Sequence, residues 1–245
     1  VNLGILQMES GDLKGAHRSL ARGLALASQA QKFLGNLEAR ANLVLCVQLA
    51  GDLDSSAKLH REVASISAEK GYRHVLHASE LTHAETLLFR GHFDEALQTI
   101  QLAEEGVVSL RNTSSIFTAR LQRASVLHHL GMYQESQVRL SKLRSELESS
   151  RYRVPHVLCL LGIANNFISL GDPVASQKYI DEASKALSGG NMVSNLSYRG
   201  ALARLLWTRA ELSSARRVCI LMAETARKNG YKLFLFEAWL HLSRI

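Results

Sequence analysis

Apolar residues return along the chain at the three- to four-residue spacing of an amphipathic helix. Residues 32–50 place five apolar side chains on one helical face: Leu34, Leu37, Ala41, Val44 and Leu45. Residues 94–107 repeat this pattern. The two prolines, Pro155 and Pro173, fall where a helix is expected to begin, a position at which proline is tolerated. We therefore expect an all-α chain, with helix-capping residues in links such as 112–114 and 188–191.

The helical pattern is organised as an internal repeat. A marker glycine returns at a constant spacing, at Gly11, Gly51, Gly91, Gly131 and Gly171, and Ala210 replaces it in a sixth copy that is one position shorter. An apolar residue follows each marker by two positions. A small residue follows by five: Ala16, Ser56, Ala96, Ser136, Ser176 and Ala215. Another small residue precedes each marker by seven positions, except in the second copy, which has Val44. The glycine allows a left-handed turn and the small residues let two helices approach closely, so each repeat is predicted to be a helix, a tight turn and a second helix.

This repeated sequence motif resembles that of the tetratricopeptide family. Six copies in phase cover essentially the whole chain. The family's standard repeat has roughly 34 residues, whereas these have 40, as in the longer-helix variant of bacterial transcription activators, signalling ATPases and some scaffold proteins. The resemblance implies one α–α superhelix over residues 1–245, with about six repeats and a partial seventh at residues 235–245. Neither end has the polar helix that caps a solenoid, so we expect the chain to be part of a longer protein.

The resemblance also implies a concave surface lined by the first helix of each repeat. Nine residues before the marker, the first four repeats have an uncharged polar residue: Asn2, Asn42, Thr82 and Gln122. In peptide-binding members of the family, an asparagine row at this place holds the backbone of an extended peptide, and an amide can both donate and accept. The alternative is that these side chains face solvent or bond to their own backbone, as most polar side chains do.

Other groove positions carry apolar and charged candidates. The apolar candidates at or near them are Leu45, Leu49, Leu81, Leu88, Phe89, Leu121, Leu161, Ile168 and Trp207. The polar candidates beside them are Glu85, His128, Asn165 and Arg204. A row of exposed apolar residues marks a contact surface, whereas residues packed on neighbouring helices would not. We expect Trp207 to contribute most, because truncating an interface tryptophan often costs about 2 kcal/mol or more.

Charge and cysteine content narrow the possible partners and the compartment. The net charge is +7, but the basic residues are spread among 22 acidic ones, which favours a solvated surface over a nucleic-acid interface. The three cysteines, Cys46, Cys159 and Cys219, are far apart in apolar helical runs, as expected for core thiols in a reducing, cytoplasmic compartment. Residues 1–10 do not form a signal peptide, and no apolar run approaches the roughly 18 residues of a membrane span.

Catalytic and metal-binding motifs do not stand out. The chain has no Gly-rich phosphate loop followed by Lys-Ser/Thr and no Gly-x-Ser-x-Gly. His74, His77, Glu80 and His83 recur every three residues, a spacing that drifts around a helix and keeps all four from sharing one face. We therefore expect no enzyme activity, no metal and no cofactor.

Three functional hypotheses remain. The first is a protein-interaction module or scaffold that binds a peptide or partner helix in the groove. The second is a ligand-sensing or regulatory arm of a larger signalling ATPase or transcription activator. The third is a structural spacer or self-association surface.

Overall fold

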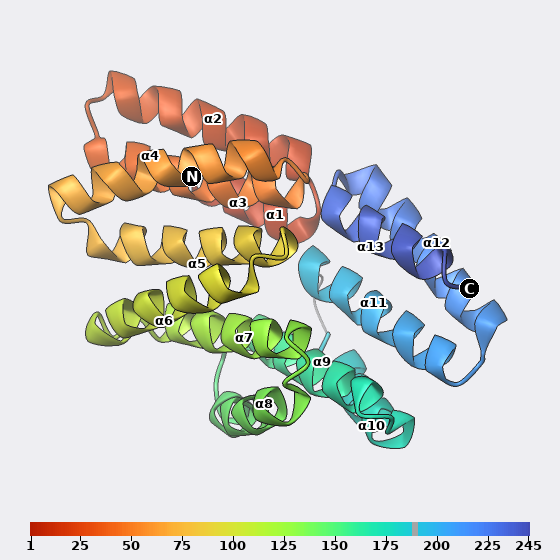
Figure 1. The fold of residues 1–245 in the computed structure, drawn as a ribbon. Helices are drawn as coiled ribbons and strands as arrows, with labels where there is room; N and C mark the ends of the chain where they lie inside the picture. Colours follow the sequence, from red (N-terminus) through yellow and green to blue (C-terminus); the bar gives the residue numbers. More distant parts are fainter. Residues whose placement is uncertain (188–190) are drawn as a thin grey trace. The chain divides into compact units, whose positions relative to one another are not determined.

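The computed structural model describes residues 1–187 and 191–245, and within them it contains helices and no strand (Figure 1). The first six helices are α1 (Asn2–Ser10), α2 (Leu13–Gln29), α3 (Phe33–Leu49), α4 (Leu53–Lys70), α5 (Arg73–Phe89) and α6 (Phe93–Ser109). The next seven are α7 (Thr113–His129), α8 (Tyr133–Glu148), α9 (Arg153–Ser169), α10 (Pro173–Ala186), α11 (Met192–Thr208), α12 (Leu212–Asn229) and α13 (Lys232–Leu242). The all-α prediction is confirmed.

The chain divides into two compact units, residues 1–122 and 123–245, with the boundary inside α7. In each unit, helices that follow one another along the chain pack together, from α1 to α6 in the first and from α8 to α13 in the second. The first helices of successive repeats also contact each other, α3 with α5, α9 with α11, and α11 with α13. Each unit is thus a stack of helical hairpins, and a single superhelix through both remains a prediction.

The tight turns follow the repeat markers. Gly51, Gly91, Gly131 and Gly171 have φ between 78° and 81°, and Ala210 adopts φ 60° in the same place. The left-handed turns predicted from the sequence are therefore confirmed. Because a side chain disfavours this region of φ, Ala210 is strained where a glycine would not be.

Helix caps complete the turns. The carboxylates of Asp12, Asp52 and Asp172 each accept a hydrogen bond from the backbone N–H three residues later, at 2.8, 3.0 and 2.9 Å. Asn112 and Asn191 cap α7 and α11 in the same way, as the link prediction required; the rest of the 188–191 link lies outside the described residues. Such caps supply acceptors for N–H groups that the first turn of a helix leaves unpaired.

Small residues occupy the helix contacts. The residue five positions after each marker is fully buried in all six copies: Ala16, Ser56, Ala96, Ser136, Ser176 and Ala215.

The three cysteines are free and buried, and burial raises the pKa of Cys46 to about 11 and that of Cys159 to about 12. These thiols fill the core, as predicted, and are poor nucleophiles at neutral pH. None of the described helices has the length and apolar character needed to cross a membrane.

Candidate functional site

The four residues of the predicted polar row all lie in the first unit. Asn2 is exposed, and Gln122 is half-buried. The Asn42 amide donates to the backbone O of Glu38 at 2.8 Å, and the Thr82 hydroxyl donates to the O of Ala78 at 3.3 Å. Two of the four side chains therefore bond to their own helix, which was the alternative interpretation. A role in holding a peptide backbone remains a prediction for this row.

The apolar candidates separate by burial. Phe89 is 47% exposed at the end of α5, and Leu45 is half-buried in α3. Three of the wider set, Leu49, Leu81 and Leu161, are at most 8% exposed. The packing alternative holds for those three, because a buried side chain is not free to meet a partner.

Glu85, a predicted site residue, belongs to a polar network inside the first unit. The Gln48 amide donates to Glu85 Oε2 at 2.7 Å, and the Thr86 hydroxyl donates to Gln48 Oε1 at 2.9 Å. Ser56 Oγ lies 3.3 Å from Thr86 Oγ1 and joins α4 to the network. Burial raises the pKa of the Glu85 carboxyl group. This network links α3, α4 and α5 and gives their polar atoms partners inside the protein.

The second unit contains a matching network two repeats further along the chain. His128 Nδ1 lies 2.6 Å from Asn166 Oδ1, and Asn166 Nδ2 donates to Ser136 Oγ at 2.9 Å. Because the amide nitrogen is the donor to Ser136, its oxygen is the acceptor, and His128 carries its proton on Nδ1. Burial lowers the pKa of His128 to about 4, so the ring is neutral at neutral pH. His128, predicted as a groove residue, thus has its Nδ1 engaged within the fold.

The repeat pattern alone did not identify the other members of the two networks as hydrogen-bonding partners. Gln48 and His128 each precede a marker by three residues, and Thr86 and Asn166 each precede one by five. The sequence did contain a signal, because these positions are polar in one repeat and apolar in the next. Leu88 and Ile168 occupy the position of Gln48 and His128, and Val126 and Leu205 occupy the position of Thr86 and Asn166.

A cavity of about 280 Å³ in the second unit brings Arg204 and Trp207 together. It is lined by α9, α11 and the C-terminal end of α13 and the residues after it: Ile168, Ser169, Ala203, Arg204, Trp207, Thr208, His241, Arg244 and Ile245. Trp207 is 48% exposed, and its Nε1 donates to the O of Arg244 at 3.3 Å. Asn165 lies one turn before Ile168 on α9 and does not line the cavity; its Oδ1 is buried and has no hydrogen-bond partner among the described residues.

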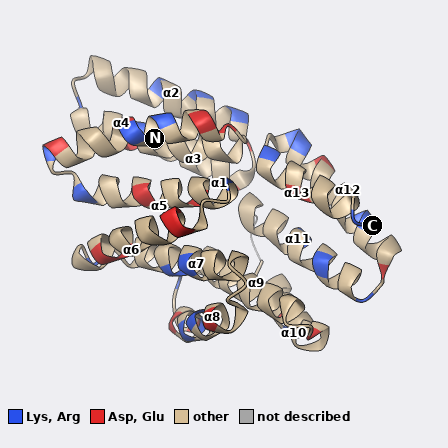
Figure 2. Ribbon diagram, in the orientation of Figure 1, with Lys and Arg blue, Asp and Glu red and all other residues tan. Residues whose placement is uncertain are grey.

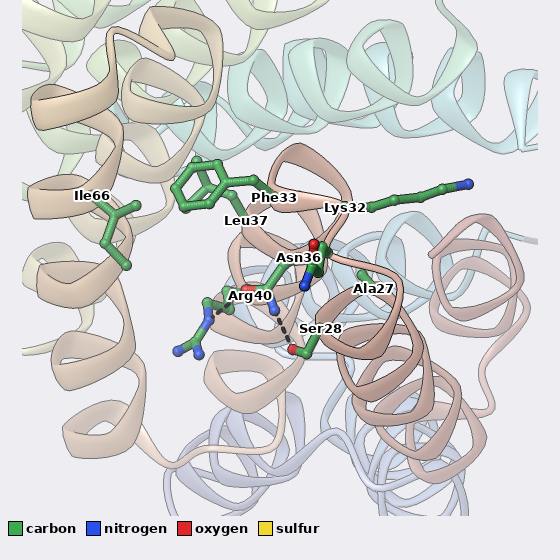
Figure 3. A pocket seen from close by; sticks show the side chains of 9 residues that line it. Ala27, Ser28, Lys32, Phe33, Asn36, Leu37, Arg40 and Ile66 are labelled. Carbon is green, nitrogen blue, oxygen red and sulfur yellow. Dashed lines mark hydrogen bonds between the residues drawn. The ribbon is translucent and has the colours of Figure 1, made fainter.

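A second cavity, of about 410 Å³, lies in the first unit where α2 ends and α3 begins (Figure 3). Phe33, Leu37 and Ile66 give it an apolar wall. Beside them, Asn36 donates to Ser28 Oγ at 2.6 Å, and Arg40 donates to Asn36 Oδ1 at 3.0 Å. Arg40 also pairs with Glu62 at 3.1 Å, so its charge is already balanced. Nothing in the repeat pattern indicated this cavity.

The histidines that recur every three residues have partners within the fold, and the surface charges are mixed in sign. His77 pairs with Glu80 at 2.8 Å, whereas His83 stacks on His60 with 4.2 Å between ring centroids. Over the described part of the chain, no three His, Cys, Asp or Glu residues lie close enough to hold a metal ion. Basic and acidic residues are interspersed along the helices (Figure 2).

Comparison with known proteins is informative only at the level of structure. The chain matches no model of a known protein family and no curated protein sequence. The crystal structure of NprR in complex with its cognate peptide NprX superposes with a TM-score of 0.77 at 14% identity, over 97% of this chain and 69% of NprR. BtubC (BKLC) from P. vanneervenii gives 0.60 at 16% identity, over 89% of this chain and 93% of that one.

A third structure identifies the repeat type. A putative kinesin light chain from Podosopora anserina, described as having nearly identical TPR-like repeats, gives a TM-score of 0.53 at 15% identity, over 78% of this chain and 95% of that one. Identities this low establish the fold alone. Together with the confirmed turns and buried small residues, they show that the chain has the fold of the tetratricopeptide-like helical repeat proteins.

Proposed function

We propose that the chain is a protein-interaction module that binds a peptide segment on the surface formed by the first helices of its repeats. The observation that carries this proposal is the cavity between α9, α11 and α13, where a half-exposed Trp207 stands beside Arg204. Tryptophan and arginine are the residue types most enriched among those that dominate protein interfaces, especially in pockets. In a structure of the same fold, NprR is in complex with its cognate peptide.

The arrangement suits a peptide anchor better than a reaction. The polar atoms of the two networks are bonded to each other and hold neighbouring helices together. The cavity of the second unit, in contrast, offers an indole face and cationic side chains that can hold one or two side chains of a partner.

Selection from a random peptide library tests the proposal. Immobilised wild-type chain is expected to enrich a set of related peptides, and Trp207→Ala is expected to lose most of that enrichment. Trp239→Ala is the matched control, because Trp239 is 49% exposed against 48% for Trp207 but does not line the cavity. Helical circular dichroism establishes that both variants fold.

Two results would overturn the proposal. The first is equal loss of enrichment in both tryptophan variants, which would place the binding surface elsewhere or show that it is non-specific. The second is no enrichment by the wild-type chain together with a molecular mass that rises with concentration, which would favour self-association instead.

A further inference from the structure

Phe33 is an exposed aromatic residue at a position that is polar in most of the later repeats. It is the first residue of α3. The first helices of the later repeats begin with Arg73, Thr113, Arg153, Met192 and Lys232. Phe33 is 44% exposed, and its ring stacks on Tyr72 with 5.6 Å between the centroids and 26° between the planes. Aromatic residues of this kind are enriched in protein interfaces.

The Phe33 ring borders the cavity of about 410 Å³ at the α2–α3 link, called here the Phe33 cavity. One repeat later, the residues equivalent to Leu37 and Ile66 are His77 and Gly106. A methyl group added to Gly106 would come within 2.3 Å of the His77 ring, so that ring fills the space against α6. The Phe33 cavity is therefore a feature of its own repeat, and its volume is in the range of ligand sites.

The wall of the Phe33 cavity has no charge that an occupant would need to balance. None of the described residues that line it is Asp or Glu. Arg40 already pairs with Glu62 at 3.1 Å. Lys32 is exposed and extends away from Phe33 and Ile66 (Figure 3). An ionised occupant would lose hydration without gaining a partner, so the wall favours a neutral one.

The polar side of the cavity has hydrogen-bond donors to spare. Ser28 donates its hydroxyl hydrogen to the O of Leu24 at 2.9 Å, and Asn36 Oδ1 accepts from Arg40 Nε. One of the two hydrogens on Asn36 Nδ2 goes to Ser28. The other, and those of Arg40 Nη2, form no hydrogen bond with the part of the chain that the structure describes. A matching occupant has an acceptor atom next to an apolar body.

We propose that the Phe33 cavity binds a tyrosine side chain of a partner peptide, with its ring against Phe33 and its hydroxyl oxygen accepting from Asn36 or Arg40. These three residues are spaced by three and four positions, so the ring and the donors lie on one face of α3. Phenylalanine lacks the oxygen, and the N–H of tryptophan can only donate. Because Phe33 is nearly half exposed, the peptide backbone can stay outside the cavity.

Four blocked peptides test the cavity in the intact chain. They are acetyl-Gly-Gly-X-Gly-Gly-amide, where X is tyrosine, phenylalanine, tryptophan or alanine, and the reporter is the NMR signal of the Ile66 methyl groups, assigned with Ile66→Val. We expect a saturable shift with the tyrosine peptide, about five-fold weaker binding of the phenylalanine and tryptophan peptides, and no saturable shift with alanine. Either of the other aromatic peptides binding as tightly as the tyrosine peptide would overturn the inference.

Substitutions that other repeats already contain locate the effect. Phe33→Arg copies the residue type of Arg73 and should weaken binding of the tyrosine peptide about ten-fold or more. Asn36→Leu copies Leu76 and should remove most of the preference for tyrosine over phenylalanine. Leu102→Arg is the control, since Leu102 is 66% exposed on α6 and does not line the cavity.

Circular dichroism establishes which variants fold. Unchanged binding by folded Phe33→Arg, or an equal loss with Leu102→Arg, refutes the role of Phe33. If Phe33→Arg does not fold, the Asn36→Leu comparison decides, and an unchanged preference for tyrosine refutes the hydrogen bond.

Further measurements distinguish the partner peptide from other occupants. p-Cresol, the tyrosine side chain without a peptide, should bind more weakly than the tyrosine peptide. Binding as tight as that of the peptide would assign the cavity to a free small molecule and overturn the peptide source. A molecular mass that rises with concentration for wild type but not for Phe33→Arg would assign it to a second copy of this chain.

This site lies in the first unit and goes beyond the proposed role of Trp207 in the second. The two proposals therefore fail separately. Library enrichment that needs Trp207, together with no shift of Ile66 by the tyrosine peptide, leaves the proposed function standing and refutes the tyrosine site. A saturable shift of Ile66 together with enrichment that does not need Trp207 has the opposite meaning.

Discussion

Acid is expected to destabilise the first unit through His60. This side chain is 7% exposed between α4 and α5, stacked on His83, with its Nδ1 2.8 Å from Ser79 Oγ. Burial, and to a smaller extent the neighbouring His83, lower its pKa from 6.5 to about 4. Protonation would therefore place a charge inside the helix contact.

The magnitude follows from the difference between the two states. Below pH 6.5 the unfolded chain binds a proton at His60, whereas the folded chain binds this proton only below about pH 4. The free energy of unfolding therefore falls as the pH falls through this window, by about 1.4 kcal/mol for each pH unit, or about 3 kcal/mol in total. Burial also lowers the pKa of His83, with Arg61 and Arg90 acting in the same direction and Glu95 against it, so His83 adds to the loss.

Urea unfolding followed by circular dichroism between pH 7 and pH 4.5 measures this effect. His60→Gln removes one titrating group, so its unfolding free energy should depend less steeply on pH than that of the wild-type chain. His17→Gln, which changes an exposed histidine, should leave the pH dependence unchanged. Parallel curves for wild type and His60→Gln would refute the reasoning.

Three further predictions concern the networks, the turns and the thiols. Asn166→Leu removes the partner of His128 and should lower the unfolding free energy by about 2 kcal/mol in urea melts at pH 7, because buried polar groups are left unpaired. Gly91→Ala should lower the unfolding free energy by about 1 kcal/mol through φ 80° alone, since no atom lies within 4 Å of the added methyl group. Ala210→Gly should raise the melting temperature, because it relieves the strain of φ 60°. A stabilising Gly91→Ala or a destabilising Ala210→Gly would contradict the strain argument. The three buried cysteines should react with a thiol reagent only after denaturation, and rapid reaction of the native chain would contradict their core placement.

The turns and close helix contacts could be predicted from the repeated sequence motif because each depends on residues that are near in sequence. A glycine at a fixed position implies a left-handed turn, and a small residue at a fixed distance from it implies a close helix contact. Both could be predicted for every copy without knowing which helices meet. Gly51 with φ 80° and the fully buried Ser56 illustrate the two signals.

The buried polar partners and the candidate site residues were harder to predict because their environment depends on helices that are distant in sequence. Thr86 bonds to Gln48 across 38 residues, and His128 contacts Asn166 across the same separation. One residue's helical position cannot show whether its partner in the next repeat is polar. The proximity of Arg204 and Trp207 could be predicted because they lie one turn apart on α11. The residues of α9 and α13 that complete their cavity could not, since they are distant in sequence.

The two polar networks make alternate repeats different, although the markers that separate the repeats are evenly spaced. Removing one repeat, residues 51–90, would place Val126 where Thr86 meets Gln48, and an amide would then face a hydrocarbon side chain. Removing two repeats, residues 51–130, would instead place Asn166 there, which can still accept and donate hydrogen bonds. We therefore expect the loss or gain of repeats in this chain to be tolerated better in pairs than singly, because odd and even repeats present different partners to their neighbours.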